Sequence, residues 1–238
     1  MIDNVFNIIQ RNLHSQHKAH ESFRFGILLA IAGGFMDSYT YIGRGGVFAN
    51  AQTGNIVLLG IYASKGEWMH ALAHIPPILA FIIGIIATQA IQNNSSHLFI
   101  SGWQRAILMF EIIVFFIIGF IPNTIPNIIV TVTVSFMASV QVASFPKLVD
   151  ATYSSTMSTG NLRSASKAAY IAFTQKDRES AIRSIRFFTI VLSFLFGAFL
   201  GGLLTLIIGV KAIWGDVIVL IFALIILNAF ELNKNSTQ

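Results

Sequence analysis

The sequence contains no cysteine, which excludes disulfide bonds, thiolate metal ligands and a cysteine nucleophile. It also lacks a phosphate-binding loop, a dinucleotide fingerprint, a GxSxG elbow and a haem-attachment pattern. No nucleophile stands at a recognisable spacing from a base and an orienting group. We therefore expect a protein that is not an enzyme and that holds neither a cofactor nor a metal ion.

Charge is the second deficit, because charged residues make up only 11% of the 238 residues, whereas about 25% is usual in a soluble domain. Hydrophobic residues make up 55% and gather in long runs. Asp, Glu, Lys and Arg are absent from residues 68–104, 112–146, 187–210 and 217–230. A helix crosses a bilayer with about 20 mainly apolar residues, and Pro122 and Pro126 divide the second interval into two spans. The sequence therefore predicts an all-α polytopic integral membrane protein.

The basic residues border the apolar segments, although the formal net charge of +5 would also suit a nucleic-acid-binding protein. One group lies in residues 1–24, ahead of a first span that we expect to begin at Phe25, and the other in residues 176–186. The positive-inside bias assigns both groups, and with them the N-terminus, to the cytoplasm. Helical spacing of the apolar residues in 1–24 predicts an amphipathic leader helix on the membrane surface. We expect a lipid environment and no nucleic-acid partner.

An internal repeat is indicated by Thr53-Gly54-Asn55 and Thr159-Gly160-Asn161, which are 106 residues apart. The flanking patterns also correspond, since Phe81–Gly84 in one half is answered by Phe194–Gly197 in the other. We predict two tandem repeats within one membrane domain, each with three long helices and one short half-helix that begins at the Thr-Gly-Asn motif. The predicted segments are a leader (1–24), repeat 1 (25–121), a loop (122–126), repeat 2 (127–231) and a polar tail (232–238).

The pass count stays open between six and eight. If each short helix crosses the membrane, the repeats are parallel; if it re-enters, each repeat has three passes and the two are inverted.

The chain resembles the YoaK-like family of uncharacterised bacterial transmembrane proteins, a domain of unknown function. The first-half pattern consists of Gly34–Asp37, Val47–Asn55 and Trp68, and the second-half pattern of Met137–Gln141 and Thr156–Gly160. This chain departs from the second pattern at Val142, where an Asn often follows the Gln. The resemblance covers roughly Arg24 to Glu231. It implies a multi-pass protein of the bacterial cell membrane with paired Thr-Gly motifs, and it implies no substrate or reaction.

Ionisable groups inside the predicted spans are candidate functional residues, because each costs roughly 2.5–3.5 kcal/mol on insertion scales. Asp37 follows Gly33-Gly34 within the first span. Glu111 lies near the start of another span, where a shallow interfacial position is the alternative. Arg163 and Lys167 are four residues apart and share one face of the second short helix.

The Thr-Gly-Asn motifs have the residue types of a helix start at membrane depth: a capping hydroxyl, a permissive glycine and an amide. Such a start presents unpaired N–H groups and a positive dipole end, and repeat-built transporters use this arrangement to bind substrate. The predicted solute-binding set is Asp37, Thr53, Gly54, Asn55, Gln141, Thr159, Gly160, Asn161, Arg163 and Lys167. In one alternative both motifs are caps and packing turns. In another, Asp37 pairs with Arg44, Arg163 or Lys167 as a structural clamp.

Two functions from different classes follow. The first is a small secondary transporter or channel-like permease for a small polar solute, anionic or zwitterionic, with Asp37 as counter-charge or proton carrier. The second is a non-transporting scaffold or partner protein whose polar motifs pack helices. The GxxxG pattern at Gly197 and Gly201 permits a close helix contact, either within the chain or between the subunits of a homo-oligomer.

Overall fold

The structure, a computed structural model, describes residues 22–98, 102–148, 151–152 and 158–235. In chain order its helices are α2 (Phe23–Gly43), α3 (Gln52–Ser64), α4 (Trp68–Ala73), α5 (Ile75–Leu98), α6 (Trp103–Ile118), α7 (Asn127–Ser144), α8 (Ser158–Gln175), α9 (Arg178–Ile208) and α10 (Ile213–Asn235). A 3-10 turn, η2 (Gly209–Ala212), precedes α10, and a two-residue antiparallel pair, β1 (Lys147–Leu148) and β2 (Ala151–Thr152), follows α7. The predicted leader helix and residues Thr156 and Met157 of the second-half family pattern lie outside the described residues.

The predicted membrane class is confirmed. Within the described residues, four helical stretches are long and apolar enough to cross a membrane, namely Phe23–Gly43, Trp68–Asn93, Asn127–Ser144 and Arg178–Ala229. The last stretch joins α9, η2 and α10. Large apolar side chains on the outer surface of the bundle, such as Phe199 and Leu206 of α9, are 63% and 73% exposed. Lipid is the solvent that such a surface requires, so the chain is a multi-pass membrane protein.

Two pairs of helices pack closely and in parallel. Along α2 and α9, Gly197 lies against the backbone of Ile31 and Gly201 against that of Phe35. Along α5 and α7, Gly84 lies against Phe136. Eight residues further along α5, Gln92 Nε2 donates a hydrogen bond to the carbonyl of Ala143 at 2.9 Å. A Cβ at any of these glycines would collide with the facing helix. The GxxxG pattern therefore serves a contact within the chain, and a homo-oligomer stays a prediction.

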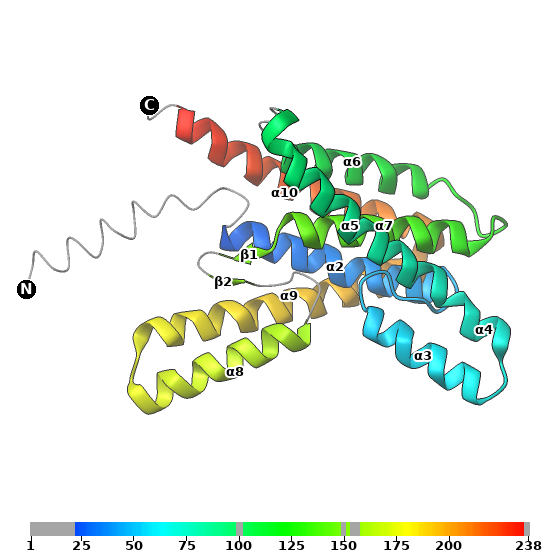
Figure 1. Ribbon diagram of the computed structural model, residues 1–238, viewed down its shortest axis with the longest axis horizontal. Helices are drawn as coiled ribbons and strands as arrows, with labels where there is room; N and C mark the ends of the chain where they lie inside the picture. Colours follow the sequence, from blue (N-terminus) through cyan, green and yellow to red (C-terminus); the bar gives the residue numbers. More distant parts are fainter. Residues whose placement is uncertain (1–21, 99–101, 149–150, 153–157, 236–238) are drawn as a thin grey trace, which may run out of the picture.

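The directions of the helices are visible in Figure 1. Helices α2, α6 and α9 run from left to right in that view, whereas α5, α7 and α10 run from right to left. Helices α3 and α8 start near the middle of the molecule and run towards opposite ends. The start of α2 and the α8–α9 turn therefore lie at one end, and the α3–α4 turn lies at the other.

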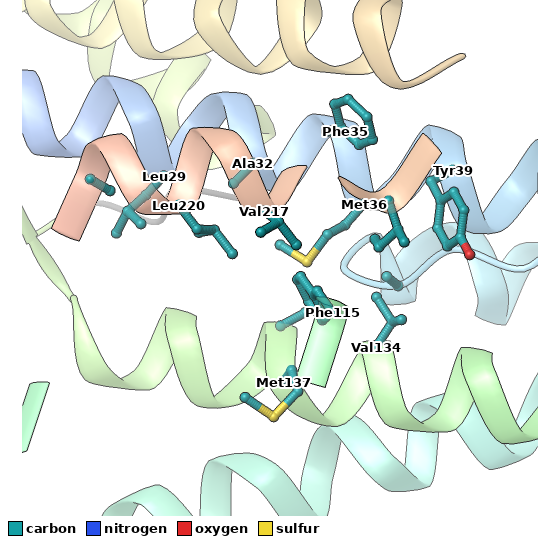
Figure 2. Packing of buried hydrophobic residues seen from close by; sticks show 14 of the residues in the cluster. Leu29, Ala32, Phe35, Met36, Tyr39, Phe115, Val134, Met137, Val217 and Leu220 are labelled. Atoms are coloured by element: carbon teal, nitrogen blue, oxygen red, sulfur yellow. The ribbon is translucent and has the colours of Figure 1, made fainter. Parts of the chain in front are cut away.

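The interior between these helices is apolar. Figure 2 shows Met36 of α2 pointing towards Phe115 of α6 and Val217 of α10, with Val134 and Met137 of α7 close by. All five side chains are at most 6% exposed. The core thus joins both predicted halves into one unit.

The end of α2 is tied to the loop between α6 and α7 by Arg44, whose side chain is 1% exposed. Its Nε donates to the Tyr39 hydroxyl at 3.0 Å, and its guanidinium donates to the carbonyl of Ile121 at 2.7 Å and to Asn123 Oδ1 at 3.3 Å. A buried guanidinium is tolerated because it has these partners. Arg44 thereby fixes the loop between α6 and α7, where the sequence predicts the boundary between two repeats.

Candidate polar sites within the bundle

The segment between α2 and α3 folds back into the bundle and is held there by Asp37. Asp37 Oδ1 accepts hydrogen bonds from the backbone N–H groups of Asn50 at 2.7 Å and Ala51 at 3.2 Å. Asn50 Nδ2 in turn donates to the carbonyl of Gly33, the central residue of α2, at 3.1 Å. Non-helical backbone therefore lies beside the middle of a membrane-spanning helix, where protein must satisfy its polar groups.

Asn55 closes the same segment from the other side. Its Oδ1 accepts from the N–H of Phe48 at 2.9 Å, and its Nδ2 donates to the carbonyl of Phe48 at 2.8 Å and to Gln52 Oε1 at 2.9 Å. His74 Nδ1 lies 3.3 Å from the same Oδ1. Asn55 is fully buried, so the asparagine of the first motif is a side chain that shapes the loop.

The other two residues of the first motif lie differently. Thr53 is exposed in the first turn of α3, and Gly54 is half-buried with its Cα facing the ring of Phe48. No side chain caps α3, whose N-cap position is Ala51. Thr53 is therefore not the capping residue that the motif predicts.

The second motif is more open. Thr159 and Gly160 are exposed in the first turn of α8, whereas Asn161 is 3% exposed. Arg163 and Lys167 are both exposed on α8. Since Asp37 is 5% exposed and bound to backbone amides, neither cation is its partner, and Arg44 is held by Tyr39, Asn123 and Ile121. Asp37 is a clamp, but it clamps a loop through N–H groups and not through an ion pair.

Gln141 belongs to a second polar group, away from Asp37. Its Nε2 donates to both carboxylate oxygens of Glu111, at 3.1 and 3.2 Å. Glu111 is the ninth of the 16 residues of α6 and is fully buried, so it does not occupy the shallow position considered as an alternative. The hydrogen bonds thus connect Asp37 with the Asn55 loop and Gln141 with Glu111.

Asp216 of α10 is the residue that sequence reasoning missed. It is fully buried, and its helix packs against α6, the helix that carries Glu111. The missed signal was the repeat spacing, because Asp216 follows Glu111 by 105 residues, one less than the spacing of the Thr-Gly-Asn motifs. Asp216 stands just ahead of a charge-free run, the position of a residue that flanks a span.

The two histidines of the α4 region go to different partners. His74 lies against Asn55, whereas His70 Nδ1 lies 3.5 Å from Glu67 at the exposed α3–α4 turn. Among the described residues, no group of three or more His, Cys, Asp or Glu side chains is placed to hold a metal ion. The pair therefore gives no structural support for metal binding.

Comparison with known proteins identifies a family and a transmembrane relative. Residues 25–226 match the model of a family described as "Protein of unknown function (DUF1275)". The chain is also 30% identical over 140 residues to the "UPF0700 transmembrane protein YoaK" of Bacillus subtilis (strain 168), an alignment that covers 58% of this chain. The alignment spans 62% of the length of that relative. No solved structure matches the chain. The predicted family resemblance is confirmed.

Proposed function

Because the chain belongs to the DUF1275 family, whose description assigns no function, we propose a function from the geometry of the polar sites. The protein is a small secondary transporter or channel-like permease of the cell membrane. Its cargo is a small polar solute, anionic or zwitterionic. The role is translocation and not catalysis.

The observation that carries this proposal is the loop held by Asp37. Transporter sites are typically formed by broken helices. In this pattern a span is followed by a segment that returns to the middle of the bundle, and the chain then leaves it as a short helix. Here Asp37 and Asn55 bind the returning backbone, and α3 begins beside the last third of α2. One oxygen of Asp37, Oδ2, has no hydrogen-bond partner among the described residues. This oxygen is the group that we assign to the solute or its counter-ion.

We further propose that the two halves are inverted repeats of three passes each, with α3 and α8 as the half-helices. Support comes from the packing, because the matched glycines Gly84 and Gly197 each lie against the first helix of the opposite half. Support also comes from α3 and α8, which run towards opposite ends of the bundle (Figure 1). The N-terminus then lies in the cytoplasm together with the basic α8–α9 turn.

The cations on α8 support an anionic or zwitterionic cargo. Arg163 and Lys167 lie two and six residues after the second motif and are exposed, so they can meet a solute. The exposed Thr159 and Gly160 stand one turn before them. In this assignment the second half attracts the charged solute, while the first half supplies Asp37 and the backbone near Asn55.

The test is accessibility in this naturally cysteine-free chain. Single Cys replacements of Asp37, Asn55, Asn161 and Lys167 are treated with a membrane-impermeant thiol reagent from each side. Leu29→Cys, at a fully buried apolar position, is the unlabelled control, and Lys65→Cys, at an exposed turn, is the labelled one. We expect labelling at the motif positions, slower than at Lys65, followed by uptake of small anionic or zwitterionic solutes into proteoliposomes. Protection of all the motif positions from both sides would overturn the proposal.

A second candidate, the scaffold, is favoured by one observation. The amide of Asn55 is fully occupied by Phe48 and Gln52, which is what a packing motif requires. Under this alternative, the protein co-purifies with a stoichiometric partner chain, and the motif cysteines stay protected. Solute uptake with no such partner present separates the transporter from the scaffold.

A further inference from the structure

Glu111 of α6 and Asp216 of α10 are fully buried carboxylic acids on two helices that pack against each other. The contact between these helices is close, because Trp214 Nε1 donates to the carbonyl of Phe116 at 3.1 Å and Gly119 packs against the ring of Trp214. Both carboxyl groups and the adjacent Gln141 of α7 are 0% exposed. Two ionised carboxylates in such a place would repel each other with little solvent to screen them.

The hydrogen bonds around the pair leave acceptors without donors. Both carboxylate oxygens of Glu111 accept hydrogen bonds from Gln141 Nε2. Within the part of the chain that the structure describes, neither oxygen of Asp216 nor Oε1 of Gln141 has a hydrogen-bond partner. A buried acceptor without a donor is costly. One hydrogen on Asp216 would turn an acceptor into a donor and would remove one of the two negative charges.

From this geometry we propose that Glu111, Asp216 and Gln141 form a proton-binding site, in which the two carboxyl groups together hold one exchangeable proton. Gln141 stabilises the ionised form of Glu111 through its two hydrogen bonds, and Asp216 carries the proton. The proton is taken from water on one side and returned to water on the same or the opposite side, so charge and atoms balance. The role of this proton as the coupling ion of a transporter rests on the proposed function. The proton-binding site itself does not.

The surrounding charges fit a single bound proton. On α6, Arg105 lies six residues before Glu111, and on α7 the facing polar group is Gln141. Asp37 of α2, a helix that packs against α10, is engaged by the loop backbone. Arg44, just after α2, is engaged by Tyr39, Asn123 and Ile121. Lys211 of η2 is exposed, and the charged residues of α9 are confined to its first turns, Arg178, Glu179, Arg183 and Arg186.

A proton suits this site better than a metal ion, because the site offers only two carboxyl groups and one amide oxygen. Hard cations take about six or more oxygen ligands. A proton needs no such coordination shell and therefore fits into the closely packed site. Since the three side chains are sealed, exchange with water requires α6 and α10 to separate. Trp214 lies on that contact and therefore reports it.

The direct test is infrared difference spectroscopy of the purified full chain in lipid nanodiscs, followed through the carboxyl C=O stretch during an alkaline titration. Wild type is expected to lose one buried C=O band per chain. In Glu111→Gln or Asp216→Asn, this transition moves by at least about one pH unit towards acid, because the neighbouring negative charge is gone. In the double variant it is absent. Glu67→Gln, at the exposed α3–α4 turn, is the matched control and keeps the wild-type transition.

Two outcomes overturn the site: an alkaline transition that persists in the double variant, or a midpoint that shifts when sodium replaces a bulky organic cation, since sodium then competes for the site. Because the substitutions are nearly isosteric, folding is checked through Trp214 emission in a Trp68→Phe, Trp103→Phe background. Proteoliposome uptake separates the two proposals. If the carboxyl band titrates but no solute is taken up, the proton site is supported and the transporter is contradicted. If uptake is independent of the pH gradient and persists in Asp216→Asn, the coupling of the proton to transport is contradicted.

Discussion

The carboxyl group of Asp37 accepts a hydrogen bond from the backbone N–H of Asn50, with 2.7 Å between Oδ1 and the nitrogen. A residue of the first spanning helix thereby fixes a loop that lies 13 positions later in the chain. This contact holds the segment just before α3 beside the middle of α2.

Replacing Asp37 by alanine is expected to destabilise the protein by about 1–3 kcal/mol, because the N–H groups of Asn50 and Ala51 lose their buried acceptor. Asp37→Asn keeps one acceptor oxygen and should retain most of the stability. Thermal unfolding in detergent, followed by tryptophan emission, measures the difference. Glu67→Ala, at an exposed position, is the control, and an Asp37→Ala variant as stable as this control would contradict the clamp.

The glycines at the two parallel helix contacts should not tolerate a side chain. Gly84→Ala and Gly197→Ala place a Cβ against the backbone of α7 and α2, and overpacking of this kind typically costs about 1–3 kcal/mol. Gly60→Ala in α3 meets no atom within 4 Å and should leave stability unchanged or slightly higher. Equal unfolding temperatures for all three variants would argue against close packing of α2 with α9 and of α5 with α7.

The inverted arrangement predicts the sides of two turns. Cysteine at Lys65, in the α3–α4 turn, should react with an impermeant reagent only from the outside, and cysteine at Lys176, in the α8–α9 turn, only from the cytoplasm. The two turns lie at opposite ends of the bundle in Figure 1. Reaction of both positions from one side would favour parallel repeats.

Removal of the buried guanidinium of Arg44 should loosen the loop between α6 and α7. Arg44→Ala deletes the hydrogen bonds to Ile121, Asn123 and Tyr39, and bonds to a charged group are worth about 1.5–3 kcal/mol each. We expect faster proteolysis or hydrogen exchange at residues 119–126 together with a lower unfolding temperature. Lys65→Ala, at the exposed α3–α4 turn, is the matched control. Unchanged exchange in the loop would show that Arg44 does not hold it.

The start of α9 offers a pH-dependent test outside the spans. Hydrogen bonds from Ser180 and from the N–H of Glu179 hold the pKa of Asp177 below its usual value. Because the pKa is depressed in the folded state, the ionised cap stabilises the fold at pH values above the pKa of Asp177 in the unfolded chain. This stabilisation is lost as the pH falls through the pKa of Asp177 in the folded protein. The stability difference between wild type and Asp177→Ala should therefore shrink on acidification. A difference that is independent of pH would contradict an ionised cap.

Much of the membrane architecture could be predicted from the spacing of charges. The charge-free intervals anticipated the spans, and Pro122 and Pro126 fall between the end of α6 and the start of α7. The importance of Asp37, Asn55 and Gln141 as buried polar residues was also visible, because such residues are rare in spans. Their partners were not visible, since backbone amides and an amide–carboxylate bond leave no pattern in the sequence.

The sequence by itself determined that this chain lives in lipid, because composition and run length decide which solvent can cover a surface. It also determined which polar residues would be expensive to bury. Only the tertiary structure decided their surroundings: Asp37 holds a loop, Gln141 holds Glu111, and Asp216 is buried on the helix that packs against the helix of Glu111. The reason is physical, since hydrogen bonds and charge interactions act over a few ångströms in space, and the residues concerned are 13, 30 and 105 positions apart in the chain.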